Sequence, residues 1–306
     1  MIQVEGLKKL YGGERGLRSF DLSVGAGESV GLVGPNGAGK TTLIKILATL
    51  LHAQAGRARI NGMDVRQQKQ AVRRIVGYMP DIPGVYQDMN VREFLLFFAD
   101  AYHLPSRQKS AAVDHILEWS GLVDRSQAYV EELSLGWRQR LALAKTLLHG
   151  PSLLLLDEPA TGLDPLARLE LRRQLKELNQ RGVTMLISSH ILSDLEDICT
   201  RVVFIAEGSN VSQPVDASNG ATPAETRTVL ELEFLSAPQA REIAQRLSGV
   251  EVLYGSDGAL RLALPAGREH IAAVVSALAG AGVGITRVQP AAGLESQYQQ
   301  LFGVKA

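Results

Sequence analysis

The chain has 306 residues, of which 45% are hydrophobic, so it is long enough for two ordinary domains with buried cores. Lys plus Arg number 32 and Asp plus Glu number 32, and this formal net charge of zero argues against binding nucleic acid through a basic excess. The single cysteine, Cys199, excludes an intrachain disulfide and is typical of a reducing compartment.

The N-terminal sequence and the longest apolar run do not favour secretion or a membrane span. The first ten residues, MIQVEGLKKL, lack the apolar core of a secretory signal. The longest nearly uncharged apolar run, residues 271–285, is shorter than the ~20 residues of a spanning helix and contains three glycines. We therefore expect a cytoplasmic chain that reaches a membrane only through a partner.

Strand and helix patterns alternate along residues 1–208, which predicts an α/β domain with a mainly parallel sheet. Residues 28–34, ESVGLVG, form an apolar run that stops at a glycine-rich loop, and helix spacing follows. The pattern is helical over about 88–149, which predicts a helical subdomain. The other predicted elements are short strands at 2–7, 19–24 and 73–80, buried strands at 152–159, 183–190 and 201–208, and an amphipathic helix at 166–182.

The pattern of the first domain fades near residue 208, and a second, smaller domain follows. Residues 209–226 are rich in Ser, Asn, Pro, Ala and Thr, which is typical of a linker. Residues 227–306 then alternate as β-α-β-β-α-β, the split βαβ order of a ferredoxin-like α+β domain, with a short final helix at 296–302.

The most specific signal is GPNGAGKT at residues 34–41, with Thr42 after it. It matches G-x-x-x-x-G-K-[ST], the Walker A phosphate loop, and it has the required strand before it and helix after it. Its glycines let the backbone approach phosphates, and the N–H groups of the helix start form an anion site. Lys40 can reach the β- and γ-phosphates, and the Thr41 hydroxyl can bind Mg²⁺. The residues expected to bind the nucleotide here are Gly34, Pro35, Asn36, Gly37, Ala38, Gly39, Lys40, Thr41 and Thr42.

The second half of the predicted site is LLLLDE at residues 153–158. Four leucines put Asp157 at the end of a buried strand, at the sheet edge where the phosphate loop also emerges. Asp157 can hold Mg²⁺, and Glu158 can polarise the attacking water as a general base. An acidic pair after an apolar run usually marks only a strand end, but beside a phosphate loop it predicts a catalytic pair.

The segment LSLGW, residues 133–137, makes the chain resemble the nucleotide-binding subunit of an ATP-binding cassette (ABC) transporter. That family has a signature close to LSGGQ before its Walker B strand, and this chain matches it at Leu133, Ser134 and Gly136 but not at Leu135 and Trp137. The resemblance implies that Ser134 and Gly136 contact the γ-phosphate held by a facing subunit. A simple helix cap at Ser134 is the alternative.

Three further residues correspond to family landmarks. Tyr11 corresponds to the aromatic residue that stacks on adenine, although it could be a plain strand-edge tyrosine. Asp164, in TGLDP, corresponds to the D-loop contact between subunits and is also a good helix cap before Pro165. His190, in SSH, corresponds to the switch histidine that touches the γ-phosphate, which implies a catalytic role beside Glu158 and Lys40.

The clearest departure from the family is in MPDIPG, residues 79–84, where Asp81 replaces the usual Gln. The resemblance implies that Asp81 still offers an oxygen to Mg²⁺ or to its water. Phe94, Phe97 and Phe98 share one face of the following helix. They are mostly core residues by their pattern, and the family's groove for the membrane subunit lies near this segment.

The resemblance implies an ATP-hydrolysing, Mg²⁺-dependent subunit that powers an ABC transporter of the drug-exporter type. It would pair head to tail as a homodimer or heterodimer, and it would sit on the inner face of the membrane through a permease subunit. A soluble ABC ATPase of the kind that acts on ribosomes or DNA, a regulatory subunit without turnover and a P-loop kinase are the alternatives. No nucleic-acid partner is expected. GLESQY, residues 293–298, resembles the family's terminal element.

Overall fold

The computed structural model describes residues 1–12, 15–82, 84, 86, 88–191, 194–195, 198–211, 215–216, 227–234, 239–247, 249–255, 258–265 and 268–290. The chain divides into two compact units, Met1–Asp216 and Ala217–Ala306. The predicted final helix at 296–302 and the GLESQY segment lie outside the described residues.

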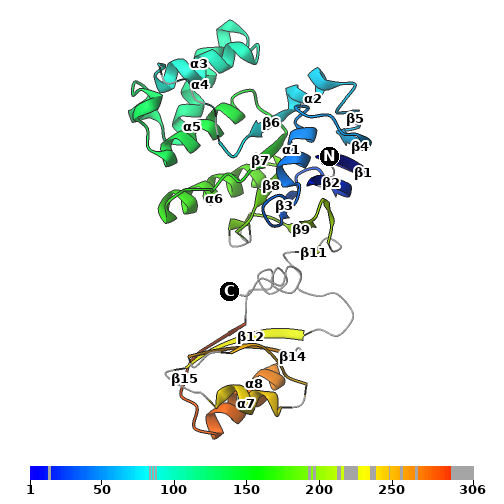
Figure 1. The fold of residues 1–306 in the computed structure, drawn as a ribbon. Helices are drawn as coiled ribbons and strands as arrows, with labels where there is room; N and C mark the ends of the chain where they lie inside the picture. Colours follow the sequence, from blue (N-terminus) through cyan, green and yellow to red (C-terminus); the bar gives the residue numbers. More distant parts are fainter. Residues whose placement is uncertain are drawn as a thin grey trace. The chain divides into compact units, whose positions relative to one another are not determined.

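Unit 1 is built on one large sheet with a parallel and an antiparallel part (Figure 1). The parallel strands lie in the order β9, β3, β8, β7, β6, and the antiparallel strands continue through β10 as β2, β1, β4, β5. The parallel strands are β3 (Ser29–Val33), β6 (Val76–Met79), β7 (Leu153–Asp157), β8 (Thr184–Ser189) and β9 (Arg201–Ala206). The antiparallel strands are β1 (Ile2–Tyr11), β2 (Arg15–Val24), β4 (Ala55–Ile60) and β5 (Met63–Asp64).

The parallel strands are short and rich in Val, Leu and Ile because they are buried on both faces. Every residue of β3, β7 and β8 is buried. Helix α1 (Lys40–Leu47) joins the two parts of the sheet in one core, since Leu43 and Ile44 pack with residues of both. Helix α6 (Pro165–Gln180) contributes Leu171 and Leu175 to a second contact with the parallel strands.

The predicted strand at 73–80 is wrong in its first half. Residues Lys69–Ile75 form helix α2, and β6 begins only at Val76. Val72 and Ile75 both turn toward the core at a three-residue spacing, which a helix satisfies and a strand does not. The strand signal from the apolar residues 75–79 therefore extended too far into the helix.

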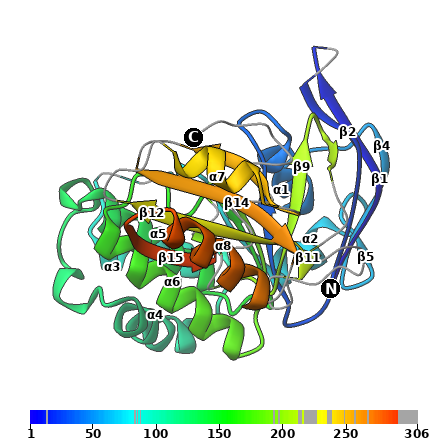
Figure 2. The ribbon, with the colours of Figure 1, turned by 90° about the horizontal axis from the view of Figure 1, so that it is seen from below.

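The predicted helical subdomain consists of α3 (Val91–Ala101), α4 (Ser106–Ser120) and α5 (Leu135–Leu147), with short 3₁₀ turns at Val123–Arg125 and Val130–Glu132. A capping box fixes the start of α3, because Asn90 accepts from the Glu93 amide and Glu93 accepts from the Asn90 amide. The three helices enclose a core of their own. Figure 2 shows α3 and α4 on the opposite side of unit 1 from β1 and β4.

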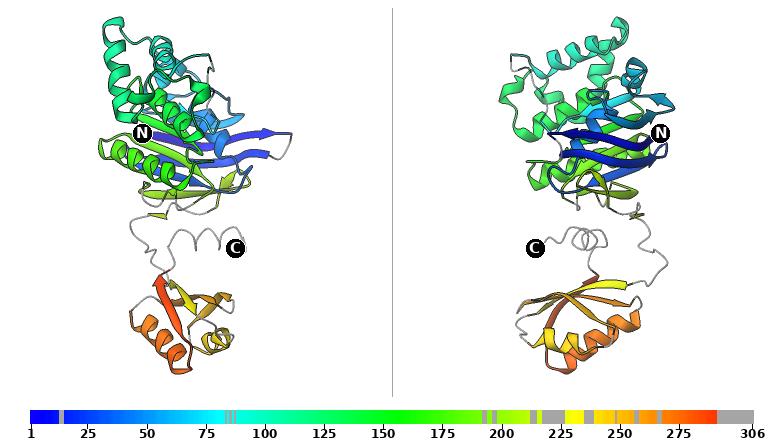
Figure 3. Two further views of the ribbon diagram at one scale, coloured as in Figure 1. Left: turned by 90° about the vertical axis from the view of Figure 1, so that its left-hand side faces the viewer. Right: turned by 45° about the vertical axis from the view of Figure 1, so that its right-hand side comes forward.

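Unit 2 is a four-stranded antiparallel sheet with both helices on one face (Figure 3). Its elements follow the order β12 (Arg227–Phe234), α7 (Ala240–Gln245), β13 (Glu251–Gly255), β14 (Ala259–Pro265), α8 (Arg268–Gly280) and β15 (Ile285–Pro290). Leu232 and Leu262 from the sheet and Leu278 from α8 are buried in its core.

Two short strands of unit 1, β10 (Ser209–Asn210) and β11 (Val215–Asp216), pair with β9 within the stretch predicted as a linker.

Leu155 tests the packing of the central sheet. It is completely buried in β7, between α1 and the neighbouring strands. Leu155→Ala should lower the free energy of unfolding of unit 1 by about 2–5 kcal/mol because it leaves a cavity. The matched control is Leu169→Ala on α6, where the side chain is 63% exposed, and it should change stability by less than about 0.5 kcal/mol. Urea unfolding followed by circular dichroism measures both, and equal losses would contradict the packing described.

Candidate functional site

The phosphate loop connects β3 to α1, and two of its glycines have no space for a side chain. A Cβ on Gly34 would lie 2.1 Å from the Ile205 carbonyl oxygen, and one on Gly39 would lie 2.8 Å from Leu17 Cδ2. Gly39 also has φ 110°, a left-handed conformation that favours glycine, and it caps α1 without a side-chain hydrogen bond. The first N–H groups of α1 therefore remain available to an anion.

Lys40 lies at the centre of the site and is only 6% exposed. Its ammonium group donates to the Gly34 carbonyl oxygen at 2.7 Å and lies 3.3 Å from Glu158 Oε1. This contact joins the phosphate loop to the end of β7. A nucleotide phosphate in the loop would compete with Glu158 for the same ammonium group.

Asp157 is buried at the end of β7, and its two carboxylate oxygens differ in their hydrogen bonds to the described residues. Its Oδ1 accepts from the hydroxyl groups of Thr41 at 3.1 Å and Ser188 at 2.8 Å. Its Oδ2 is buried and has no hydrogen-bond partner. Burial raises the pKa of the Asp157 carboxyl, and the charges of Asp81 and Glu158 add to the rise. An unpaired carboxylate oxygen beside a threonine hydroxyl fits a Mg²⁺ ion that takes its other ligands from phosphates and water.

Glu158 has a strained backbone that turns its carboxylate toward Lys40 and His190. Its φ is 49°, which is uncommon for a non-glycine residue and concentrates at functional sites. The Ser188 hydroxyl accepts the Glu158 amide at 3.0 Å and so holds the turn. Glu158 Oε2 lies 2.7 Å from His190 Nδ1, at the end of β8. The structure thus brings Lys40, Glu158 and His190 into one connected network.

A cavity of about 440 Å³ lies over this network. Tyr11, which is 46% exposed, lines it from the end of β1, and Asp81 lines it from the segment after β6. The phosphate-loop residues Asn36, Gly37, Ala38, Gly39, Lys40, Thr41 and Thr42 also line it, together with Glu158 and His190. Tyr11 and Asp81 therefore line the cavity at which the sequence analysis expects them.

Three residues of this site were not among those predicted from the sequence. Arg15 and Thr161 line the cavity, and Ser188 holds both Asp157 and the Glu158 amide. Ser188 belongs to the SSH segment, two residues before the predicted switch histidine, and that position was the available signal. Arg15 is the first residue of β2, and Thr161 is the first residue of the TGLDP segment.

Ser134 and Gly136 do not line this cavity. Ser134 is exposed at the N-cap of α5, and its side chain makes no capping hydrogen bond. Leu135 is the first residue of the helix and is not among the residues with positive φ, so its departure from glycine leaves the loop backbone unstrained. Its Cδ2 fills the space over Gly162, where a Cβ would lie only 2.8 Å away.

The helix that begins at Ser134 is tied to the segment after β7 within the same chain. The buried amide of Gln139 donates to the Pro159 carbonyl oxygen at 2.7 Å. Arg140 pairs with Glu170 of α6 and lies 4.6 Å from the ring centre of Trp137, as does Arg125. Asp164 accepts the amides of Leu166 and Ala167 at 3.0 and 2.9 Å, so it caps α6 as predicted.

A phosphate loop between a buried strand and a helix, with a carboxylate pair at the end of β7, which β8 separates from β3, defines a P-loop ATPase. A family model described as ABC transporter matches residues 17–161. A Nod factor export ATP-binding protein I from Burkholderia orbicola (strain AU 1054) is 38% identical over 69% of this chain and 70% of that protein. The chain therefore belongs to the ATP-binding proteins of ABC transporters, and ATP hydrolysis is its activity.

Other relatives agree. A bacitracin transport ATP-binding protein from Bacillus licheniformis is 38% identical over 68% of this chain and 67% of that protein. A daunorubicin resistance ATP-binding protein from Streptomyces coeruleorubidus is 33% identical over 82% and 78%. The solved structure of an ATP-binding subunit of an ABC transporter matches with a TM-score of 0.64 at 30% identity, over 71% of this chain and 90% of that chain. A dimeric ATP-binding cassette bound to ADP and phosphate has the same TM-score at 22% identity, over 71% and 99%, and shares the fold.

Asp157→Asn tests the assignment of the unpaired oxygen. The amide keeps the size of the side chain but removes a buried negative charge, so the protein without nucleotide should melt at the same temperature or a few degrees higher. The rise in melting temperature on adding ATP with Mg²⁺ should be lost, because the metal ligand is neutral. Differential scanning fluorimetry measures both. Asp124→Asn, at an exposed position, is the control, and an unchanged response of the Asp157 variant to Mg²⁺ would reject the assignment.

Proposed function

We propose that this chain hydrolyses ATP to drive export through a membrane permease with which it assembles. The observation that carries the proposal is the network of Lys40, Glu158 and His190 under the phosphate loop, in a chain whose relatives are named for the export of Nod factor and for resistance or transport of antibiotics. A soluble ABC ATPase acting on ribosomes or DNA is the alternative, and the transport names of these relatives do not favour it.

In the proposed reaction, Thr41 and Asp157 would hold Mg²⁺, Asp81 would offer an oxygen to the ion or to its water, and the ion would supply positive charge to the phosphates. Lys40 binds the β- and γ-phosphates. Glu158 accepts a proton from the attacking water, and His190 orients Glu158 and meets the γ-phosphate. The 2.7 Å contact between His190 and Glu158 and the unpaired Asp157 Oδ2 support these roles. Tyr11 would stack on the adenine.

We further propose that two such subunits, identical or different, face each other head to tail around two nucleotides. Ser134 and Gly136 of one subunit would then contact the nucleotide held by Lys40 of the other. The exposed Ser134 hydroxyl, which makes no cap bond, and the open N–H groups of α5 support this arrangement. It also explains why both residues lie away from the cavity of their own chain.

The permease is proposed to dock on an aromatic patch at the start of the helical subdomain, which we define as Tyr86 and Phe97. Their side chains are 50% and 40% exposed, and their rings meet edge to face at 5.1 Å. An exposed apolar cluster of this kind marks a contact surface. Within the described residues no helix is long and apolar enough to cross a membrane. In our proposal, the permease therefore anchors the chain to the inner face of the membrane.

For the domains we propose an ATP-binding domain at 1–208 with a helical subdomain at about 88–149, a linker at 209–226 and a small domain at 227–306. The β-α-β-β-α-β order of unit 2 and the neighbour order β13, β14, β12, β15 support a ferredoxin-like fold for the last.

The head-to-tail arrangement is tested by mixing two inactive variants. Lys40→Ala and Ser134→Arg should each abolish steady-state ATP hydrolysis when alone. In a mixed dimer one pocket carries both defects and the other carries none. If equal amounts of the two variants pair at random, about a quarter of all pockets should therefore be intact. A phosphate-release assay on the permease complex measures the recovery. A mixture no more active than either variant would rule out a shared pocket.

The aromatic patch is tested by Phe97→Glu. A charge on this patch should reduce co-purification with the permease by tenfold or more, because an apolar contact would have to bury a carboxylate. Leu169→Glu, on an exposed position of α6, is the control and should co-purify normally. Circular dichroism checks that both variants remain folded. Normal co-purification of the Phe97 variant would remove the patch from the interface.

A further inference from the structure

The basic residues of this neutral chain are unevenly distributed. Residues 52–74 contain six Lys or Arg and one acidic residue, Asp64, so this stretch alone has a formal charge of +5. Four of its side chains define what we call the α2 basic surface, namely His52, Arg66, Lys69 and Arg74. All but Lys69 are exposed, and Lys69 is half-buried. None of these four residues is among the described residues that line the cavity of the ATP site.

The cations of this surface are not neutralised within the described residues. No ion pair joins Arg66, Lys69 or Arg74 to a carboxylate there. Lys69 Nζ instead lies 3.3 Å from His52 Nε2, which puts two basic groups side by side. Asp64 Oδ1 accepts the amides of Arg66 at 2.8 Å and Gln67 at 3.2 Å, so the backbone holds this carboxylate, and it forms no ion pair with a described residue. Arg66, Lys69 and Arg74 also line one common hollow of about 430 Å³.

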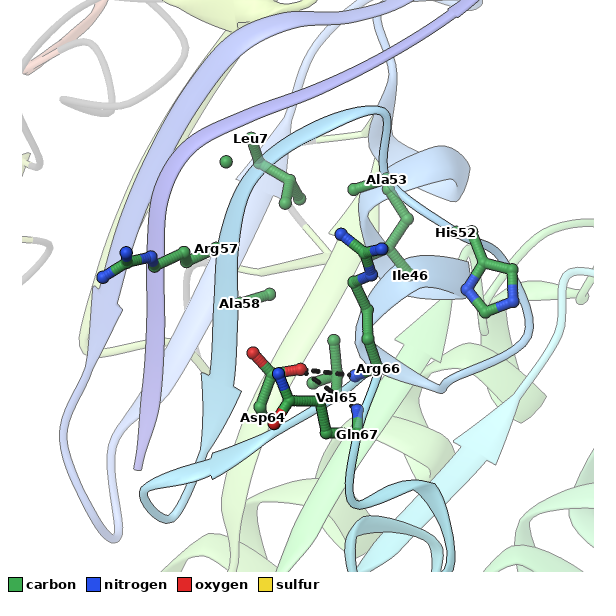
Figure 4. A pocket seen from close by; sticks show the side chains of 11 residues that line it. Leu7, Ile46, His52, Ala53, Arg57, Ala58, Asp64, Val65, Arg66 and Gln67 are labelled. Carbon is green, nitrogen blue, oxygen red and sulfur yellow. Dashed lines mark hydrogen bonds between the residues drawn. The ribbon is translucent and has the colours of Figure 1, made fainter.

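A hollow with an apolar floor adjoins these cations, and Asp64 and Gln67 line it as well. It has a volume of about 640 Å³ and lies between β4, β5 and α1 (Figure 4). Leu7, Ile46, Ala58 and Val65 form its floor. Figure 4 shows the Arg66 side chain extending along the hollow toward Ile46 and Ala53, whereas Arg57 points to the other side of β4. A guanidinium group that forms no ion pair with any described residue therefore lies directly over an apolar floor.

This combination of a cation and an apolar floor fits an anionic amphiphile better than a free phosphate ion or an acidic peptide. The guanidinium group binds a phosphate with paired hydrogen bonds, and the floor can cover glycerol and the first acyl carbons. Helix α2 lies at the same end of unit 1 as α3, the upper end in Figures 1 and 3. A permease bound at the aromatic patch of that end would hold the α2 basic surface near lipid headgroups.

We propose that the α2 basic surface binds the headgroups of anionic phospholipids, with Arg66 and Lys69 at the phosphate. The inference goes beyond docking on a permease and uses that docking only for orientation. It gives the chain a second attachment to the membrane, which depends on lipid charge.

The test is flotation of the full chain with vesicles of phosphatidylcholine alone and with vesicles in which phosphatidylglycerol replaces about a third of it. The chain should partition onto the anionic vesicles only, and raising the salt from about 0.1 M to about 0.5 M should release it. Each cation near such a surface contributes about fivefold in partitioning. R66E/K69E should therefore lower the partition coefficient by about 25-fold or more.

The matched control is R173E/K176E, which makes the same change of charge at two exposed positions of α6. It should bind the anionic vesicles with at most a twofold loss. Both variants should retain the melting temperature of the wild type. Equal partitioning of R66E/K69E and wild type, or equal binding to both kinds of vesicle, would overturn the proposal.

A loss of permease co-purification in detergent by R66E/K69E, without any vesicle binding by the wild type, would also overturn it. That outcome would assign the surface to an acidic protein segment. Because the vesicles contain no permease, failure of this test leaves the proposed export function untouched, and that function fails only by its own two tests.

Discussion

The contact between Lys40 and Glu158 is the interaction on which the ATP site depends. A lysine that is only 6% exposed needs a negative partner, because an isolated buried charge is costly. Glu158 supplies it from the end of a different strand, and in doing so it brings the phosphate loop and the catalytic pair to one place. The hydrogen bonds of Ser188 to Asp157 and to the Glu158 amide keep both carboxylates in position.

The register of the parallel strands makes this contact possible. Val33 at the end of β3 pairs with Ser189 of β8, and Asp157 at the end of β7 pairs with Ser188. The last residues of three strands are therefore level with one another at one edge of the sheet. The loops that follow these strands therefore lie next to one another, and the residues on these loops determine the chemistry of the site.

The sequence was sufficient for the parts of the site that one local segment determines. The phosphate loop, the acidic pair after four leucines and the histidine after a buried strand all depend on short patterns, and they lie together in the structure. Helix α2 was missed because only two of its seven residues are apolar and face the core. The apolar Ile75 at its end directly precedes β6, so the hydrophobic pattern resembled one longer strand. Arg15 could not be assigned from sequence, because it reaches the cavity only when distant strands pair. Ser188 was overlooked although it belongs to the SSH segment, because its contact with Asp157 depends on the pairing of β7 and β8. The same holds for Arg66, whose charge is visible in the sequence but whose apolar neighbours come from β1, α1 and β4.

The contact of Leu135 with Gly162 gives the departure from the family signature a meaning. The leucine side chain at position 135 fits because position 162 is a glycine, and the signature loop and the loop after β7 therefore pack against each other inside one subunit. In a head-to-tail pair, the first loop would touch the neighbour's nucleotide, while the second follows this chain's own acidic pair. A Cβ at position 162 would lie 2.8 Å from Leu135 Cδ2, so any larger residue there would force one of the two loops to move.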